Sequence, residues 1–233
     1  MLYNFRNLTS DDKVFFSLLK KIKPQVDEQD FLLVEKERRR EIFLDPLAVL
    51  HKAYEIINKI KATGERWKDP SFGPTENDPN GLSSMYFFAN TIPAGCPDPE
   101  TVTWTPLDEI AGERPALFFD KTGMTANEDL QSDFLGDCWF ISALSVIATH
   151  DEFIRGAFEP TEEAIKEIDD TEVVKMMIGI YTPIFHFLRN FGIYVFRFFK
   201  NYQWVYVMVD DRLPVLPNGQ ILYGKCRPKA QDL

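Results

Sequence analysis

The sequence predicts an α+β fold, because its apolar residues follow a helical period in some segments and strand-like patterns in others. Helical stripes occur in the first 66 residues and again after Cys138, whereas residues 193–209 are rich in β-branched and aromatic residues. With 233 residues, 45% of them hydrophobic, the chain can bury a sizeable core. We expect two regions: a helical N-terminal region, residues 1–66, and a mixed region, residues 67–233.

Three helices are expected in the N-terminal region. The second is charged and should cover about residues 27–44. The third has the clearest boundaries, because Asp45 can serve as its N-cap and Pro46 as its first helical residue. Gly64 stands where a C-cap belongs.

Loops, helices and a hairpin should follow in the second region. Pro, Gly, Asn and Asp are frequent in residues 67–130, which favours loops with short strands. Helices are expected over residues 138–150 and 183–191. Residues 193–200 and 204–209 should pair as an antiparallel hairpin, and Asn218-Gly219 marks a further tight turn.

Composition excludes several functions. A formal net charge of −10 argues against nucleic-acid binding. Cys96, Cys138 and Cys226 make a sparse, odd set without zinc spacing, which is typical of a reducing compartment. The most apolar region, residues 178–199, is too often interrupted by polar residues to be a transmembrane segment, and no secretion signal is evident. We therefore expect a cytoplasmic protein.

Cys138 is the strongest candidate for chemistry. It follows Gly136-Asp137, precedes Trp139, and stands where an apolar helix should begin. A helix N-terminus stabilises a thiolate, which is the nucleophilic form of cysteine, and Trp139 can shield the site from water. The alternative is an unreactive cysteine buried as a small apolar residue.

This stretch resembles the catalytic-cysteine motif of the calpains, the calcium-dependent cysteine proteases with a papain-like active site. The family pattern is Gln-Gly-x-Leu-Gly-Asp-Cys-Trp, and residues 131–139 read Gln-Ser-Asp-Phe-Leu-Gly-Asp-Cys-Trp. Three further segments are similar to calpain motifs in the same order: residues 67–74, residues 103–110, and a hairpin formed by residues 192–199 and 204–214. The resemblance covers about residues 67–233.

The resemblance implies the cysteine-bearing half of a papain-like core, with Cys138 as the nucleophile of an intracellular endopeptidase that acts on protein substrates. A non-catalytic, calpain-like binding or regulatory module is the alternative. A stop codon directly after Leu233 would favour the module, whereas a continuation carrying the missing histidine and asparagine would favour the enzyme.

The histidines do not complete the site. In calpains, the histidine and the asparagine come from the second half of the core, whereas residues 67–233 match the first half. Of the three histidines, His51 lies in the N-terminal region, His150 stands at the far end of the helix that follows Cys138, and His186 lies in an aromatic segment. We expect a missing second half or a second chain to supply the base, and little activity from this chain alone.

The resemblance also implies a glutamine six residues before the cysteine as an oxyanion donor, beside the backbone N–H of Cys138. Here Gln131 stands seven residues before Cys138, and Ser132 stands six before. Either the loop has one extra residue, or Ser132 has replaced the amide; a glutamine without a catalytic role is the remaining alternative.

A calcium site is a further implication of the resemblance. Aligning on Gln131 gives Gly123 as a carbonyl ligand and Glu128 as an acidic ligand, with Asp232 as the distal acid. This match favours the extra loop residue. Alignment on Cys138 without a gap gives Met124 and Asp129 instead, and solvated surface acids are the remaining alternative.

Overall fold

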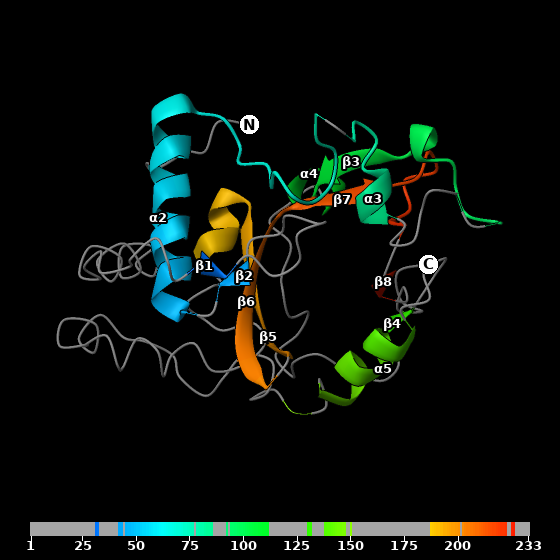
Figure 1. Ribbon diagram of the computed structural model, residues 1–233. Coiled ribbons are helices and arrows are strands. Elements are labelled where there is room, and N and C mark those ends of the chain that lie inside the picture. The colour runs from blue at the N-terminus through cyan, green and yellow to red at the C-terminus, as the bar shows by residue number, and fades with distance from the viewer. Residues whose placement is uncertain are drawn as a thin grey trace. The chain divides into compact units, whose positions relative to one another are not determined.

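The chain folds into helices and small antiparallel sheets, as shown by a computed structural model (Figure 1). The structure describes residues 31–32, 42–43, 45–76, 78–85, 92, 94–111, 130–131, 138–147, 150, 187–200, 202–222 and 225–226. The α+β fold class is confirmed. The chain divides into two compact units, one formed by residues 1–71 and 152–210 and the other by residues 72–151 and 211–233. The division predicted after residue 66 stays a prediction.

The first unit contains a four-stranded antiparallel sheet with the order β1-β2-β6-β5. Its strands are β1 (Phe31–Leu32), β2 (Ile42–Phe43), β5 (Ile193–Lys200) and β6 (Gln203–Asp210). The predicted hairpin is confirmed, because β5 and β6 pair along their whole length, from Ile193 opposite Asp210 to Lys200 opposite Gln203. Tyr202 in the connecting turn has a φ of 63°.

The charged helix expected over residues 27–44 is wrong where the structure describes that segment. Phe31–Leu32 and Ile42–Phe43 form strands, and β2 adds to β6. Apolar residue pairs on both sides of a charged stretch fit a helical period, but β2 finds backbone partners in β6, and β1 finds them in β2. Long-range pairing of this kind leaves no local signal in the sequence.

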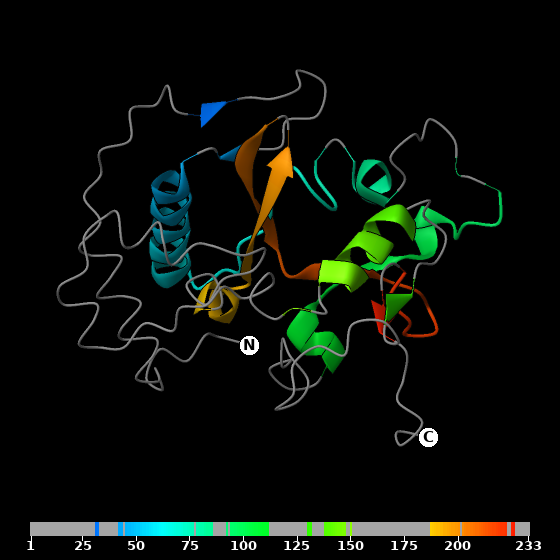
Figure 2. The same cartoon turned by 90° about the horizontal axis from the view of Figure 1, so that it is seen from below.

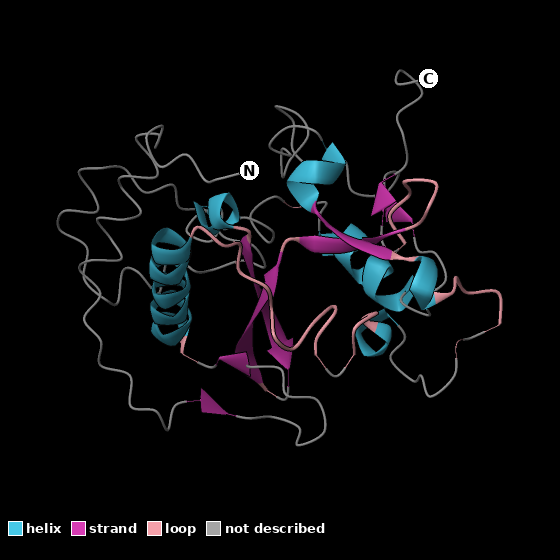
Figure 3. Ribbon diagram, turned by 90° about the horizontal axis from the view of Figure 1, so that it is seen from above, coloured by secondary structure: helices cyan, strands magenta, loops and turns pink. Residues whose placement is uncertain are grey.

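Helix α2 (Pro46–Thr63) forms as predicted. The Asp45 side chain accepts a hydrogen bond from the Leu47 N–H at 2.9 Å, and the Gly64 N–H donates to the Ile60 carbonyl at 2.8 Å, so both ends are capped. The helix buries one face against the sheet and the 3₁₀-helix η4 (Phe187–Phe191), which Figure 3 shows beside it. The buried face comprises Ala48, Val49, Leu50, Ala53, Ile56, Ile57 and Ile60.

The second unit is built from short elements, as expected for residues 67–130. Strand β3 (Thr103–Pro106) pairs with β7 (Arg212–Val215), and β4 (Leu130–Gln131) pairs with β8 (Lys225–Cys226). Its helical elements are α3 (Leu82–Met85), η3 (Pro99–Thr101), α4 (Leu107–Ala111) and α5 (Cys138–Ile147). Among the helices of the described residues, none is both long and apolar enough to span a membrane.

Trp104 is enclosed by its neighbours in the second unit. Its Nε1–H donates to the Asn80 carbonyl at 3.2 Å, and its ring meets Phe72 edge-on at 5.6 Å between centroids. Gly81 contacts the same ring so closely that an added Cβ would lie 2.7 Å from Nε1. The close packing therefore depends on a glycine at this position.

Asp78 organises the loop that carries Gly81. Its carboxylate accepts hydrogen bonds from the Leu82 N–H at 2.8 Å and from the Ser83 N–H and hydroxyl at 2.8 and 2.6 Å. Partial burial acts to raise the pKa of Asp78, but these hydrogen bonds outweigh burial and hold the pKa below its ordinary value. The carboxylate thus caps α3 in its charged form.

We predict that Gly81→Ala destabilises the fold more than Gly219→Ala does. Both glycines have positive φ, 67° and 81°, so each alanine costs about 1 kcal/mol in backbone strain. Only Gly81 also meets Trp104, whereas a Cβ at Gly219 meets nothing within 4 Å, so overpacking should add about 1–3 kcal/mol at Gly81. Urea unfolding of both variants measures the difference, and equal losses would contradict the described position of Trp104.

Candidate active site

Cys138 is the first residue of α5, and its thiol is exposed. The predicted start of the helix is therefore confirmed, although the helix ends at Ile147 rather than near His150. The first backbone N–H groups of a helix have no partner within it, and the helix dipole adds a partial positive charge there. The thiol thus stands at the N-terminal end of α5 and is accessible to a reagent.

Helix α5 is apolar but carries no buried residue. Trp139 and Val146 are 72% and 68% exposed, and Ser142 and Ala143, which lie between them on the same side, are also exposed. Trp139 meets Phe140 edge-on, at 5.7 Å between ring centroids. Because both Trp139 and Cys138 are exposed, the expected shielding of the thiol from water is not seen.

Strand β4 brings the backbone of Gln131 to the same unit as the nucleophile and contacts α5. Gln131 pairs with Lys225 and Leu130 with Cys226, and Figure 2 shows β4 and β8 side by side next to α5. The structure does not describe the Gln131 side chain or Ser132, so the role of Gln131 in the oxyanion hole stays a prediction.

His150, which belongs to the same unit as Cys138, is not placed to act on it. His150 is exposed and follows α5, and its N–H donates to the Ile147 carbonyl at 3.1 Å. It therefore stands beyond the opposite end of a helix about 15 Å long. His51 lies on α2, in the first unit, with its Nε2 atom buried, and His186 lies outside the described residues.

The candidate calcium ligands Gly123, Glu128 and Asp232 lie outside the described residues, as do Met124 and Asp129. In the part of the chain that is described, no group of three or more His, Cys, Asp or Glu side chains is arranged to hold a metal. Calcium binding therefore stays a prediction.

The acidic pair Asp210-Asp211 takes part in hydrogen bonds with segments far away in the sequence. The Asp210 carboxylate accepts a hydrogen bond from the Asp69 N–H at 2.8 Å, and the Asp211 carbonyl accepts one from the Leu107 N–H at 2.9 Å. Arg212 donates to the Phe72 carbonyl at 3.4 Å. These bonds fix segments on either side of the β6–β7 junction.

Sequence reasoning did not identify β8 as part of the site. Lys225–Cys226 is only two residues long and carries no motif, so nothing in the sequence marks it as the partner of β4. A short strand paired with the segment just before the cysteine motif restrains the backbone of Gln131. The position of Cys96 was likewise unforeseen: it packs against the buried pair Met85 and Leu222.

The family described as "Calpain family cysteine protease" matches residues 67–232. Calpain-5 of Mus musculus is 30% identical over 186 residues, which are 77% of this chain and 24% of calpain-5. Calpain-A of Drosophila melanogaster is 29% identical over 180 residues, which are 77% of this chain and 17% of calpain-A.

The chain belongs to the calpain family. Calpain clp-1 of Caenorhabditis elegans is also similar, with 28% identity over 170 residues, 73% of this chain and 17% of clp-1. The chain thus spans about a quarter or less of the length of the relatives that it matches.

We predict that iodoacetamide alkylates Cys138 faster than Cys96 in the folded chain at neutral pH. Cys138 is exposed at a helix N-terminus, whereas Cys96 is half-buried against an apolar cluster. Mass spectrometry of timed samples measures both rates, and the unfolded chain in urea, where the rates should converge, is the control. Equal rates in the folded chain would contradict the described start of α5.

Proposed function

We propose that this chain supplies the nucleophilic half of a calcium-dependent cysteine endopeptidase, with Cys138 as the nucleophile. The observation that carries the proposal is the exposed thiol at the first residue of α5, next to the paired strands β4 and β8. The match of residues 67–232 to the calpain family supports it. The substrates would be proteins.

The residues of this chain perform part of an acyl transfer. The Cys138 thiolate attacks the scissile carbonyl carbon, and its new C–S bond forms as the carbonyl oxygen becomes an oxyanion. The backbone N–H of Cys138, with the Gln131 amide if the loop has one extra residue, donates hydrogen bonds to that oxyanion. An imidazole must then protonate the leaving amine, and water must hydrolyse the thioester.

The imidazole is the part that the described residues do not supply. His150 lies past the far end of α5, and His51 lies on α2. We propose that a second half of the core, carried by further sequence or by another chain, provides the histidine and the asparagine.

A non-catalytic binding module is the second candidate function. The position of His150 beyond the C-terminal end of α5 favours it, because a thiolate without a nearby base does not turn over peptides efficiently. The coding sequence after Leu233 separates the two candidates. A continuation with a histidine and a later asparagine in calpain-type segments favours the enzyme, and a stop codon confirmed in the transcript favours the module.

Calcium is proposed as the cofactor, with Gly123, Glu128 and Asp232 as the residues that would hold it. A backbone carbonyl and two carboxylates are the hard oxygen donors that Ca²⁺ prefers. The pairing of Leu130 with Cys226 supports the proposal, because antiparallel strands direct the chain before one and the chain after the other to the same end of the ladder. Glu128 stands two residues before Leu130, and Asp232 stands six residues after Cys226.

We predict that the 233-residue chain alone cleaves casein at least about 100-fold more slowly than an intact calpain, with calcium present. General acid–base catalysis contributes about 10²–10⁴-fold, and His150, the described histidine of the same unit as Cys138, is not placed to provide it. Release of acid-soluble peptides measures the rate, with Cys138→Ala as the background control. Rapid cleavage that disappears in Cys138→Ala would show that this chain already contains its base, and would make His186 the first residue to substitute.

We predict that calcium at 10-fold to 100-fold above its dissociation constant stabilises the folded chain by about 1.4–2.7 kcal/mol. With three protein ligands, we expect a dissociation constant of about 10⁻⁴–10⁻³ M. Calorimetric thermal midpoints, with magnesium as the ionic control, measure the effect. Glu128→Gln should remove most of it, and the matched variant Asp169→Asn should retain it. If both variants respond like the parent chain, Glu128 is not a ligand.

A further inference from the structure

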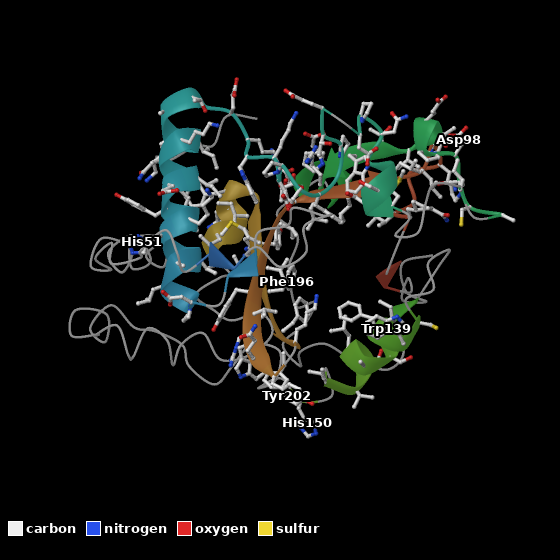
Figure 4. The ribbon with its side chains drawn as sticks, in the orientation of Figure 1. His51, Asp98, Trp139, His150, Phe196 and Tyr202 are labelled. Atoms are coloured by element: carbon white, nitrogen blue, oxygen red, sulfur yellow. The ribbon has the colours of Figure 1, made fainter. Side chains whose placement is uncertain are left out.

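The β5–β6 hairpin ends in exposed aromatic side chains that the proposed protease chemistry does not use. Phe199, Tyr202 and Trp204 are 60%, 97% and 48% exposed. Large aromatic side chains dominate cores and interfaces, so three exposed ones within six residues mark a surface that another body covers. Figure 4 places Tyr202 at the tip of the hairpin.

The exposed pair continues a face that is buried closer to the core. Phe199 lies opposite Trp204 near the turn. On the same face but farther from the turn, Val195 lies opposite Met208, and Val195 and Met208 are both buried. Strand β2 reaches along β6 only as far as Tyr206. The Phe199–Trp204 pair therefore lies two residue pairs beyond the part of the sheet that β2 supports.

The aromatic side chains at this end are held together and lie beside positive charge. The rings of Phe199 and Trp204 meet at 62° with centroids 5.2 Å apart, and the Arg197 guanidinium carbon lies 3.7 Å from the Trp204 ring centroid. Between residues 192 and 209 the sequence has two basic residues, Arg197 and Lys200, and no acidic one. The turn end of the hairpin thus carries a formal charge of +2 in a chain of −10, which leaves −12 on the rest of the chain, including Asp210 at the far end of β6.

We propose that this hairpin tip, defined by Phe199, Tyr202 and Trp204 with Arg197 and Lys200, docks on the surface of an anionic lipid bilayer. Tryptophan and tyrosine favour the boundary between membrane and water, and basic side chains are attracted to anionic headgroups. All three aromatic side chains belong to the turn or to the second residue pair from it, so shallow insertion of one end of the hairpin would cover them together.

Charge complementarity also sets the orientation of docking. The remainder of the chain is acidic and is repelled by an anionic surface, but at physiological salt that repulsion decays over about 8 Å. The basic, aromatic tip is the part of the chain that an anionic membrane surface attracts. Strand β5 is an edge strand of the described sheet and could pair with an extended peptide, but the three exposed aromatic side chains gather at the turn rather than along that edge. Two basic residues and three aromatic ones make a weak, reversible contact.

Sedimentation with vesicles tests the proposal. The 233-residue chain should bind vesicles of one part phosphatidylserine to two parts phosphatidylcholine, should not bind pure phosphatidylcholine vesicles, and should bind less as salt rises. Lys200→Gln should weaken binding roughly fivefold, the effect of one basic residue at an anionic surface. The double variant Phe199→Ser/Tyr202→Ser should abolish binding, and Tyr202→Ser alone should reduce it.

Two controls make the result specific to the hairpin. Val146→Ser removes a 68% exposed apolar side chain from α5 and should bind vesicles like the parent chain. Cys138→Ala should do the same, so the result does not depend on the protease proposal. Thermal midpoints equal to that of the parent chain confirm that the hairpin variants, which change exposed side chains, remain folded.

Three results would overturn the proposal. The parent chain could bind anionic vesicles no better than neutral ones, or the double variant could bind them as well as the parent does. The parent could also bind poly-glutamate but not vesicles, which would identify an acidic protein segment as the occupant.

Discussion

Hydrogen bonds made by three consecutive buried residues, 210–212, are the constraint on which both units depend. Each residue bonds a segment far away in the sequence: a carboxylate to the Asp69 N–H, a carbonyl to the Leu107 N–H and a guanidinium to the Phe72 carbonyl. Each bond joins segments more than 100 residues apart in the sequence, so together the bonds restrain the chain around residues 210–212. The segments that they fix include the start of the region matched to the calpain family.

Helix α2 shows what local signals can predict. Asp45, Pro46 and Gly64 act on the nearest backbone groups, so their effect can be read without knowing the rest of the fold. The hairpin was predictable for a similar reason, because its strands are separated only by a turn. The strands at Phe31–Leu32 and Ile42–Phe43 were not, since β2 depends on a partner more than 160 residues away in the sequence.

The same distinction applies to the candidate site. The position of Cys138 at the start of α5 followed from its immediate neighbours, and the structure bears it out. The pairing of β4 with β8 joins two short segments almost 100 residues apart, and neither contains a recognisable pattern. The exposure of Trp139 was also beyond sequence reasoning, because the burial of a helix face depends on what packs against it.

Tyr202 has a consequence for the stability of the hairpin. A non-glycine residue with a φ of 63° is strained by roughly 1–2 kcal/mol, and glycine or asparagine would fit the turn at lower cost. A side chain that is 97% exposed gains almost nothing within the chain to offset that strain. The turn is therefore less stable than the same turn with glycine or asparagine at position 202 would be. Such local strain is typical of segments shaped by function rather than by folding.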